Sequence, residues 1–158
     1  MKIRLIFFCL LLLPYVSALS EEKIEISVNP ERSYNALGDT INISLNINDI
    51  DSISGYEICL DYDESTLVTL TVSEGVLFRE SGYSTFWSVL STEDSIHVDN
   101  SILGSGNYVN GAGELVEIGF MAIDEGFSIL DIITARVFSG LTERDSISTI
   151  NGSISISS

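Results

Sequence analysis

His97, the only histidine of the chain, and Cys59 carry the side chains best suited to nucleophilic or acid–base catalysis. A Ser–His–Asp or Cys–His site would need His97 as its base, but no G-x-S-x-G or family-type cysteine motif accompanies it. Cys59 has no positive neighbour in the sequence that would lower the pKa of its thiol. The 23 acidic residues offer many carboxylate pairs for glycoside hydrolysis, although a domain of this size seldom holds the cleft that a hydrolase needs. We therefore expect no enzymatic activity.

Oxygen-bearing side chains gather in two turn-like groups that could offer ligands to calcium. Neither group follows the EF-hand spacing, and glycine is missing where that loop requires it. One histidine and one cysteine also make a poor zinc site. We interpret these residues as ordinary turn and edge residues and expect no metal and no cofactor. The two groups are Asn46, Asn48, Asp49 and Asp51, and Asp61, Asp63 and Glu64.

Exposed aromatic rings on a flat sheet can stack on sugars or anchor a protein partner. Tyr83, Phe86, Trp87 and Tyr108 are the residues that could do this. Phe86 and Trp87 are adjacent in an alternating run, so they face opposite sides of a strand and at most one of them lies in the core. Binding of a polysaccharide thus stays open, and it would need several of these rings exposed in one plane.

The first residues have the features of a secretory signal. Lys2 and Arg4 supply a positive start, an apolar run follows, and small residues end at Ala18, where a signal peptidase would cut. The apolar run is too short to cross a bilayer. We expect a signal peptide at residues 1–18 and one secreted, extracellular domain at residues 19–158, without membrane insertion after cleavage.

Cleavage would leave a strongly acidic domain. Loss of Lys2 and Arg4 lowers the formal net charge from −16 to −18. Phosphate groups bind to basic surfaces, so we expect neither nucleic acid nor an anionic membrane as a partner. Cys9 would leave with the signal, so Cys59 would have no intrachain disulfide partner. Stability would then depend on a hydrophobic core.

The elements that position these residues are β-strands, because polar and apolar residues alternate along most of the remaining chain. β-branched residues dominate the alternating runs, and turn residues separate them. The pattern predicts an all-β antiparallel sandwich with a single helical turn near 63–66. It also predicts a glycine-rich loop at 100–113, which either has a function or only connects the two sheets. The alternating runs are 23–28, 40–47, 56–62, 67–72, 85–90, 95–99, 114–123, 127–138 and 146–156.

The run at 56–62 has two chemically different sides. Tyr56, Ile58, Leu60 and Tyr62 face the predicted core, whereas Glu57, Cys59 and Asp61 face outward. In the run at 95–99, His97 and Asp99 likewise point away from the apolar side. Such a face is negative. On the residues alone it is an ordinary solvated face, and the alternative is that its charge attracts a partner that carries Lys or Arg.

Several motifs occur in the order and spacing of one known family. A strand that ends in Tyr-Asp is followed by a leucine, a glycine-led strand comes later, and a Gly-Phe-Ser turn precedes the closing strand. Together these motifs resemble the cohesin domain over about residues 23–157. Glu64 stands where that family usually has proline. The segments are Gly55 to Asp63 with Leu67, Gly113 to Phe120, Gly126 to Ser128 and Asn151 to Ile156.

The resemblance implies a nine-stranded antiparallel jelly-roll sandwich, related to carbohydrate-binding sandwiches, that binds a dockerin-bearing protein in extracellular polysaccharide degradation. Calcium in such complexes belongs to the dockerin. Gly55 would let a partner helix approach the backbone, and Leu141 would give apolar contact at the edge. A carbohydrate-binding module and a structural envelope or adhesion domain are the alternatives. The implied contact residues are Gly55, Glu57, Cys59, Asp61, His97, Asp99 and Leu141.

Overall fold

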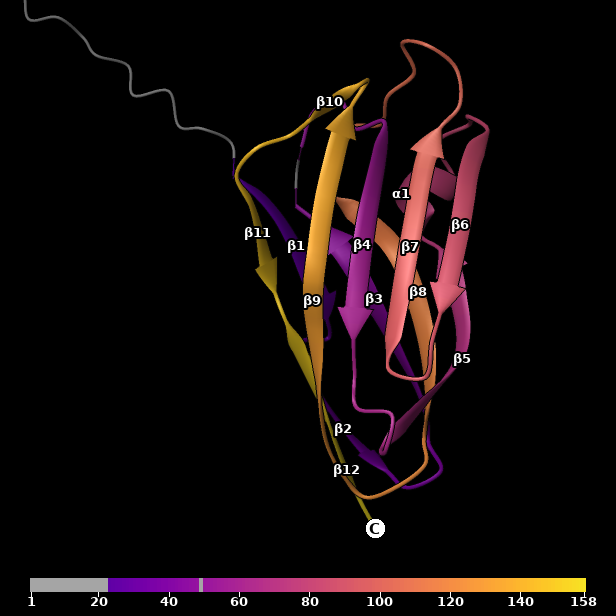
Figure 1. Ribbon diagram of the computed structural model, residues 1–158, viewed down its shortest axis with the longest axis vertical. Coiled ribbons are helices and arrows are strands. Elements are labelled where there is room, and N and C mark those ends of the chain that lie inside the picture. The colour runs from indigo at the N-terminus through magenta and orange to yellow at the C-terminus, as the bar shows by residue number, and fades with distance from the viewer. Residues whose placement is uncertain (1–22, 49) are drawn as a thin grey trace, which may run out of the picture.

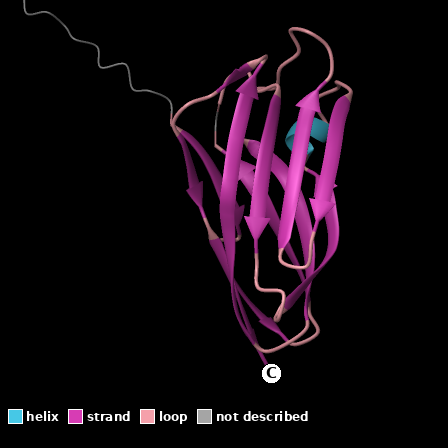
Figure 2. Cartoon of the chain, viewed as in Figure 1, coloured by secondary structure: helices cyan, strands magenta, loops and turns pink. Residues whose placement is uncertain are grey.

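The computed structural model describes residues 23–48 and 50–158, so the expected signal peptide and Asp49 lie outside it. The alternating runs form strands in two facing sheets (Figures 1 and 2). The elements are β1 (Ile24–Asn29), β2 (Arg32–Ala36), β3 (Thr40–Ile47), β4 (Gly55–Asp61), β5 (Leu67–Glu74), α1 (Val76–Arg79), β6 (Thr85–Ser91), β7 (Ser95–Ile102), β8 (Gly113–Ala122), β9 (Gly126–Ser139), β10 (Thr142–Glu143), β11 (Ile147–Ile150) and β12 (Gly152–Ser157).

One sheet has the strand order β11-β1-β3-β8-β5, and the other has the order β2-β12-β9-β4-β7-β6, with β10 paired to β9. The inward residues of both sheets form a single core of Ile, Leu, Val and aromatic side chains. This arrangement follows from the alternation, because each strand has one apolar side to bury. The jelly-roll sandwich predicted from the sequence is confirmed.

Both ends of the described chain pass from one sheet to the other. β1 and β11 lie in the first sheet, whereas their successors β2 and β12 lie in the second. β1 pairs with β11 and β2 pairs with β12, and both pairings are parallel within a sandwich that is otherwise antiparallel. The run predicted at 146–156 is therefore two strands, which is one reason why the described residues hold twelve strands where nine were expected.

Tyr56 anchors β4 from inside the core. Its hydroxyl donates a hydrogen bond to the carbonyl of Leu115 at 2.5 Å and accepts one from the side-chain amide of Asn100 at 3.3 Å. Its ring packs edge-on against Phe78 of α1, with 5.0 Å between the ring centroids. β4 is thus tied to β7, β8 and α1, and its outward side chains stand on a rigid base.

The helical turn predicted near 63–66 is a hydrogen-bonded turn without a helix. The carbonyl of Asp63 accepts bonds from the N–H groups of Thr66 at 3.1 Å and Leu67 at 3.0 Å. The helix of the described chain is α1, which follows Gly75 and buries Phe78. No helix among the described residues is long and apolar enough to cross a membrane.

Candidate functional site

The outward residues of β6, β7, β4 and β9 form a flat lattice, which we call the β4 face. β4 pairs with β7 on one side and β9 on the other, and β6 lies beyond β7. Because residues opposite one another share a side of the sheet, the register places the outward residues in rows. The three rows are Phe86, Ser101, Gly55 and Phe138; Ser88, Asp99, Glu57 and Arg136; and Leu90, His97, Cys59 and Thr134.

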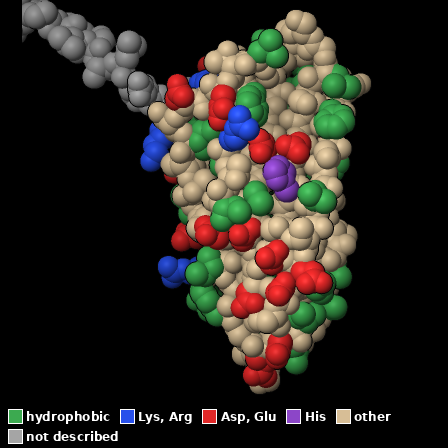
Figure 3. Space-filling view, viewed as in Figure 1, with side chains coloured by type: hydrophobic (Ala, Val, Ile, Leu, Met, Phe, Trp, Pro, Cys, Tyr) green, Lys and Arg blue, Asp and Glu red, His purple; other side chains and the backbone are tan. Residues whose placement is uncertain are grey.

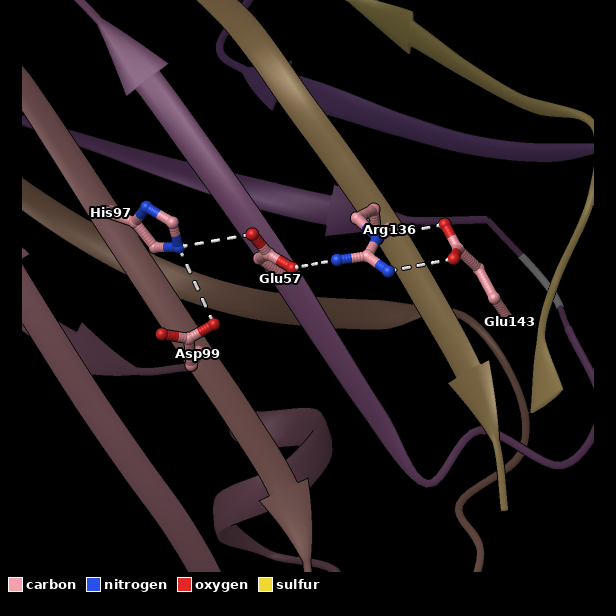
Figure 4. A network of polar contacts seen from close by, with 5 residues as sticks. All are labelled: Glu57, His97, Asp99, Arg136 and Glu143. Atoms are coloured by element: carbon pink, nitrogen blue, oxygen red, sulfur yellow. Dashed lines mark hydrogen bonds and ion pairs between the residues drawn. The ribbon is translucent and has the colours of Figure 1, made fainter. Parts of the chain in front are cut away.

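A chain of charged contacts runs across the middle of this face (Figure 4). One oxygen of Glu57, Oε2, accepts a hydrogen bond from Nη1 of Arg136 at 2.7 Å. The same guanidinium binds both carboxylate oxygens of Glu143 at 2.9 Å. On the other side, Nε2 of His97 lies 3.5 Å from Oε1 of Glu57 and 3.6 Å from Oδ1 of Asp99. These four pairs are all the ion pairs found in the described part of the chain.

Arg136 places a positive charge next to Glu57, where the sequence predicted a face with negative charges alone. Its hydrogen bonds lower the pKa of Glu143, and the two glutamates raise the pKa of the guanidinium. The cation also lies 5.1 Å from the centre of the Phe138 ring. Glu57 therefore shares the one positive charge of Arg136 with Glu143, and the guanidinium already occupies one acceptor position of its Oε2.

A hollow of about 330 Å³ opens beside this charged chain. Phe86 and Phe138 are among its lining residues, and Gly55 lies in it. A Cβ atom added at Gly55 would lie 2.8 Å from the carbonyl oxygen of Asn100 and 3.3 Å from Cβ of Ser101. Gly55 is thus required for the pairing of β4 with β7, whatever a partner does at this surface.

Cys59 and Asp61 follow Glu57 along β4 and point to the same side. Partial burial raises the pKa of the Cys59 thiol, and the nearby charge of Asp61 raises it further. Desolvation also raises the pKa of Asp61, with contributions from other carboxylates. Cys59 lies opposite His97 in the strand register, yet no hydrogen bond between their side chains occurs in the structure. A thiol with a raised pKa is the opposite of an activated nucleophile.

Comparison with known proteins identifies the fold family. A family model, the cohesin domain, matches residues 25–156. The chain belongs to the cohesin family. Among curated proteins, none matches its sequence.

Solved cohesins have the same fold at low sequence identity. The non-cellulosomal cohesin of Archaeoglobus fulgidus is 21% identical, with a TM-score of 0.66 over 86% of this chain and 92% of the other. CaCohA2 of Clostridium acetobutylicum is 20% identical, with a TM-score of 0.70 over 86% of this chain and 92% of the other. A chain of a type I cohesin–dockerin complex from Clostridium thermocellum is 14% identical, with a TM-score of 0.70 over 85% and 93%.

The sequence-predicted contact residues of this cohesin domain fall into one region. Gly55, Glu57, Cys59 and Asp61 lie along β4, and His97 and Asp99 lie beside them on β7. Leu141 is fully exposed in the turn between β9 and β10, at the end of β9 that pairs with Gly55. All seven predicted residues are therefore on or next to the β4 face. Figure 3 shows the histidine of this face next to acidic side chains.

Several residues of the cohesin surface were not among those predicted from the sequence. Arg136 and Glu143 complete the charged chain, and Leu90 adds an exposed apolar side chain next to His97. Arg136 lies 79 residues after Glu57, so no local pattern connects them. The alternation in the run at 127–138 does place Arg136 and Phe138 on one side, but the sequence does not reveal that β9 lies next to β4.

The aromatic residues are divided among different environments in the cohesin fold. Trp87 packs against the core, whereas Phe86 on the same strand is 58% exposed, as the alternation predicted. Tyr83 and Tyr108 are both partly exposed outside the strands. A larger groove of about 860 Å³ lies between β5 and β6, but Tyr62 is its only aromatic lining residue. With Trp87 packed on the core, an exposed row of Tyr83, Trp87 and Tyr108 is not formed.

Proposed function

We propose that this cohesin domain binds a dockerin-bearing protein through the β4 face and has no enzymatic activity of its own. The observation that carries the proposal is the match of the whole described domain to the cohesin family. Solved relatives of the same fold include chains of cohesin–dockerin complexes. The raised pKa of Cys59 also argues against a thiol nucleophile on this surface.

The β4 face offers two kinds of contact to such a partner. At one end, the hollow with Phe86 and the exposed Leu141 provide apolar surface. Asp99 in the middle and Asp61 at the other end provide carboxylates. Among the described residues Asp61 has no ion pair, and Asp99 has the 3.6 Å contact with His97. A partner surface with an apolar anchor and with Lys, Arg or hydroxyl donors would complement this arrangement.

The setting of this interaction is also part of the proposal. Residues 1–18 would direct export, and the domain at 19–158 would act outside the cell, where it would bring a dockerin-bearing enzyme to a polysaccharide. Calcium would be carried by the dockerin. The acidic composition, with 23 acidic against seven basic residues, agrees with a protein partner of opposite charge.

The test is calorimetric titration with each dockerin-bearing protein encoded in the same genome. Phe86→Ala should weaken binding by about 1.5–3 kcal/mol if the ring is fully covered. Glu57→Ala should weaken it too, because it removes a carboxylate from the centre of the face and leaves the Arg136 guanidinium with Glu143 as its remaining carboxylate partner. Glu117→Ala is the matched control, since Glu117 is an exposed strand glutamate on the opposite sheet.

Tight binding that survives both substitutions would move the interface away from the β4 face. If no dockerin binds, and the protein is instead retained on an insoluble polysaccharide, the carbohydrate-binding alternative is correct. Gly55 is unsuitable for this test, because any side chain there would disturb the pairing of β4 with β7.

A further inference from the structure

His97 lies between two carboxylates at distances that a hydrogen bond does not explain. Its Nε2 atom is 3.5 Å from Oε1 of Glu57 and 3.6 Å from Oδ1 of Asp99. Hydrogen bonds from a ring nitrogen to an oxygen are usually about 2.7–3.2 Å long. One nitrogen and two oxygens, one from each of Glu57, His97 and Asp99, thus lie within 4.8 Å of one another.

These distances fit the edges of a zinc coordination tetrahedron. Zinc binds imidazole nitrogen and carboxylate oxygen at about 2.0–2.1 Å, which places neighbouring ligand atoms about 3.3 Å apart. The two edges from Nε2 of His97 to the carboxylate oxygens, at 3.5 and 3.6 Å, would each contract by a few tenths of an ångström, and the carboxylates would close around the ion from a separation of at most 4.8 Å. Imidazole also favours zinc and related transition metals over calcium and magnesium, which prefer oxygen ligands alone.

The sheet fixes the three ligands in this arrangement. Glu57 and Asp99 are directly opposite on β4 and β7, and His97 is two residues before Asp99 on the same side of β7. Arg136 holds Oε2 of Glu57 at 2.7 Å and so leaves Oε1 directed toward His97 (Figure 4). Metal-binding carboxylates are commonly oriented by such an outer hydrogen bond.

The local charge also suits a divalent cation. Glu57, Asp99 and Glu143 carry three negative charges and Arg136 carries one positive charge, which leaves −2 when His97 is neutral. The three ligand side chains are 24–51% exposed, so a metal ion can reach them from solvent. Three protein ligands leave one coordination position of a tetrahedron open to water.

We propose that Glu57, His97 and Asp99 bind one Zn²⁺ ion, through Oε1, Nε2 and Oδ1 respectively. The sequence alone indicated no zinc site, because it shows one histidine and one cysteine without the usual ligand spacing. The ligands come together only through the pairing of β4 with β7. This proposal does not depend on dockerin binding, so zinc binding is measured on the protein without any partner.

The experiment is calorimetric titration of the metal-free protein with ZnCl₂, with CoCl₂ added separately to obtain a visible absorption spectrum. We expect one zinc ion per chain and the intense visible bands of tetrahedral Co²⁺. His97→Gln and Asp99→Asn should each weaken zinc binding at least tenfold, whereas Glu117→Gln on the opposite sheet should leave it unchanged. Circular dichroism checks that each variant is folded. We expect all three to fold, because the substituted side chains lie on strands and are not buried.

Zinc binding that is unchanged in His97→Gln, or that shows several weak sites per chain, would overturn the proposal in favour of general attraction to an acidic surface. Cys59→Ser tests the identity of the ligands, because Cys59 lies opposite His97 but does not belong to the proposed ligand group. The proposed ligand set requires that this variant bind zinc as the unaltered protein does. Loss of binding in Cys59→Ser would show that the set is wrong.

Discussion

Removal of one hydroxyl group from beneath the β4 face should measurably destabilise the domain. In Tyr56→Phe the ring stays in place, so no cavity forms and the contact with Phe78 is kept. The variant loses the bond to the Leu115 carbonyl at 2.5 Å and the bond from Asn100 at 3.3 Å, both inside the core. A buried polar group left without a partner costs about 1–3 kcal/mol, so we expect a decrease of about 2 kcal/mol in the free energy of unfolding.

Urea unfolding followed by circular dichroism measures this change. Tyr34→Phe is the matched control, because Tyr34 is 79% exposed on β2, and it should change stability by less than about 0.5 kcal/mol. Equal unfolding free energies for Tyr56→Phe and Tyr34→Phe would show that the Tyr56 hydroxyl contributes no net stabilisation.

Tyr56→Phe should also differ from the unaltered protein in how its free energy of unfolding changes at alkaline pH. Burial raises the pKa of Tyr56 above the usual tyrosine value of 10.0. The folded protein therefore holds this proton more tightly than the unfolded chain, and the resulting stability is complete below pH 10 and is lost as the pH rises beyond it. Tyr56→Phe should lack this part of the alkaline decrease. Parallel stability curves for the two proteins between pH 9 and pH 11 would contradict the prediction.

Three further outcomes concern the sheet and its face. A double-mutant cycle of Glu57→Gln and Arg136→Met, measured by urea unfolding, should give a coupling of about 0.2–1 kcal/mol that falls with added salt, because the pair is partly exposed. Gly75→Ala should lower the unfolding free energy by at least about 2 kcal/mol, because the new Cβ would overlap backbone atoms of β8. A Tm equal to that of the unaltered protein would disprove that close approach. Cys59 should react with iodoacetamide more slowly than a free cysteine at neutral pH, and Asp61→Asn should accelerate the reaction by removing a charge that raises the thiol pKa. Reaction rates that do not respond to Asp61→Asn would show that the carboxylate has no such influence.

The side-chain directions on individual strands could be predicted from the sequence, whereas the neighbours across strands could not. Alternation placed Glu57 outward and Tyr56 inward, and it separated Phe86 from Trp87, because the side-chain period of a strand is two residues. It could not show that Arg136 lies beside Glu57, since sheet order depends on how the whole core packs.

The turn at 63–66 does not form a helix, and the cause is local. Asp63 and Ser65 are typical both of helix starts and of tight turns, and here the Asp63 side chain accepts bonds from the Ser65 N–H and hydroxyl within a turn. α1 consists of four residues, and only Phe78 among them is fully buried, so it leaves almost no periodic signal in the sequence. Isolated turns of this length are decided by tertiary packing.

The parallel pairing of β1 with β11 has a consequence for the biogenesis of the protein. The hydroxyl of Ser148 donates to the carbonyl of Ile24, 124 residues earlier in the chain. Closing a loop of that length costs on the order of 4 kcal/mol of chain entropy, and it has to wait until the ribosome has made the last strands. Until then the outer edge of β1 has free backbone groups that can pair with another nascent chain. Every partly folded state that precedes the docking of β11 therefore exposes this edge, and association between chains is favoured in those states.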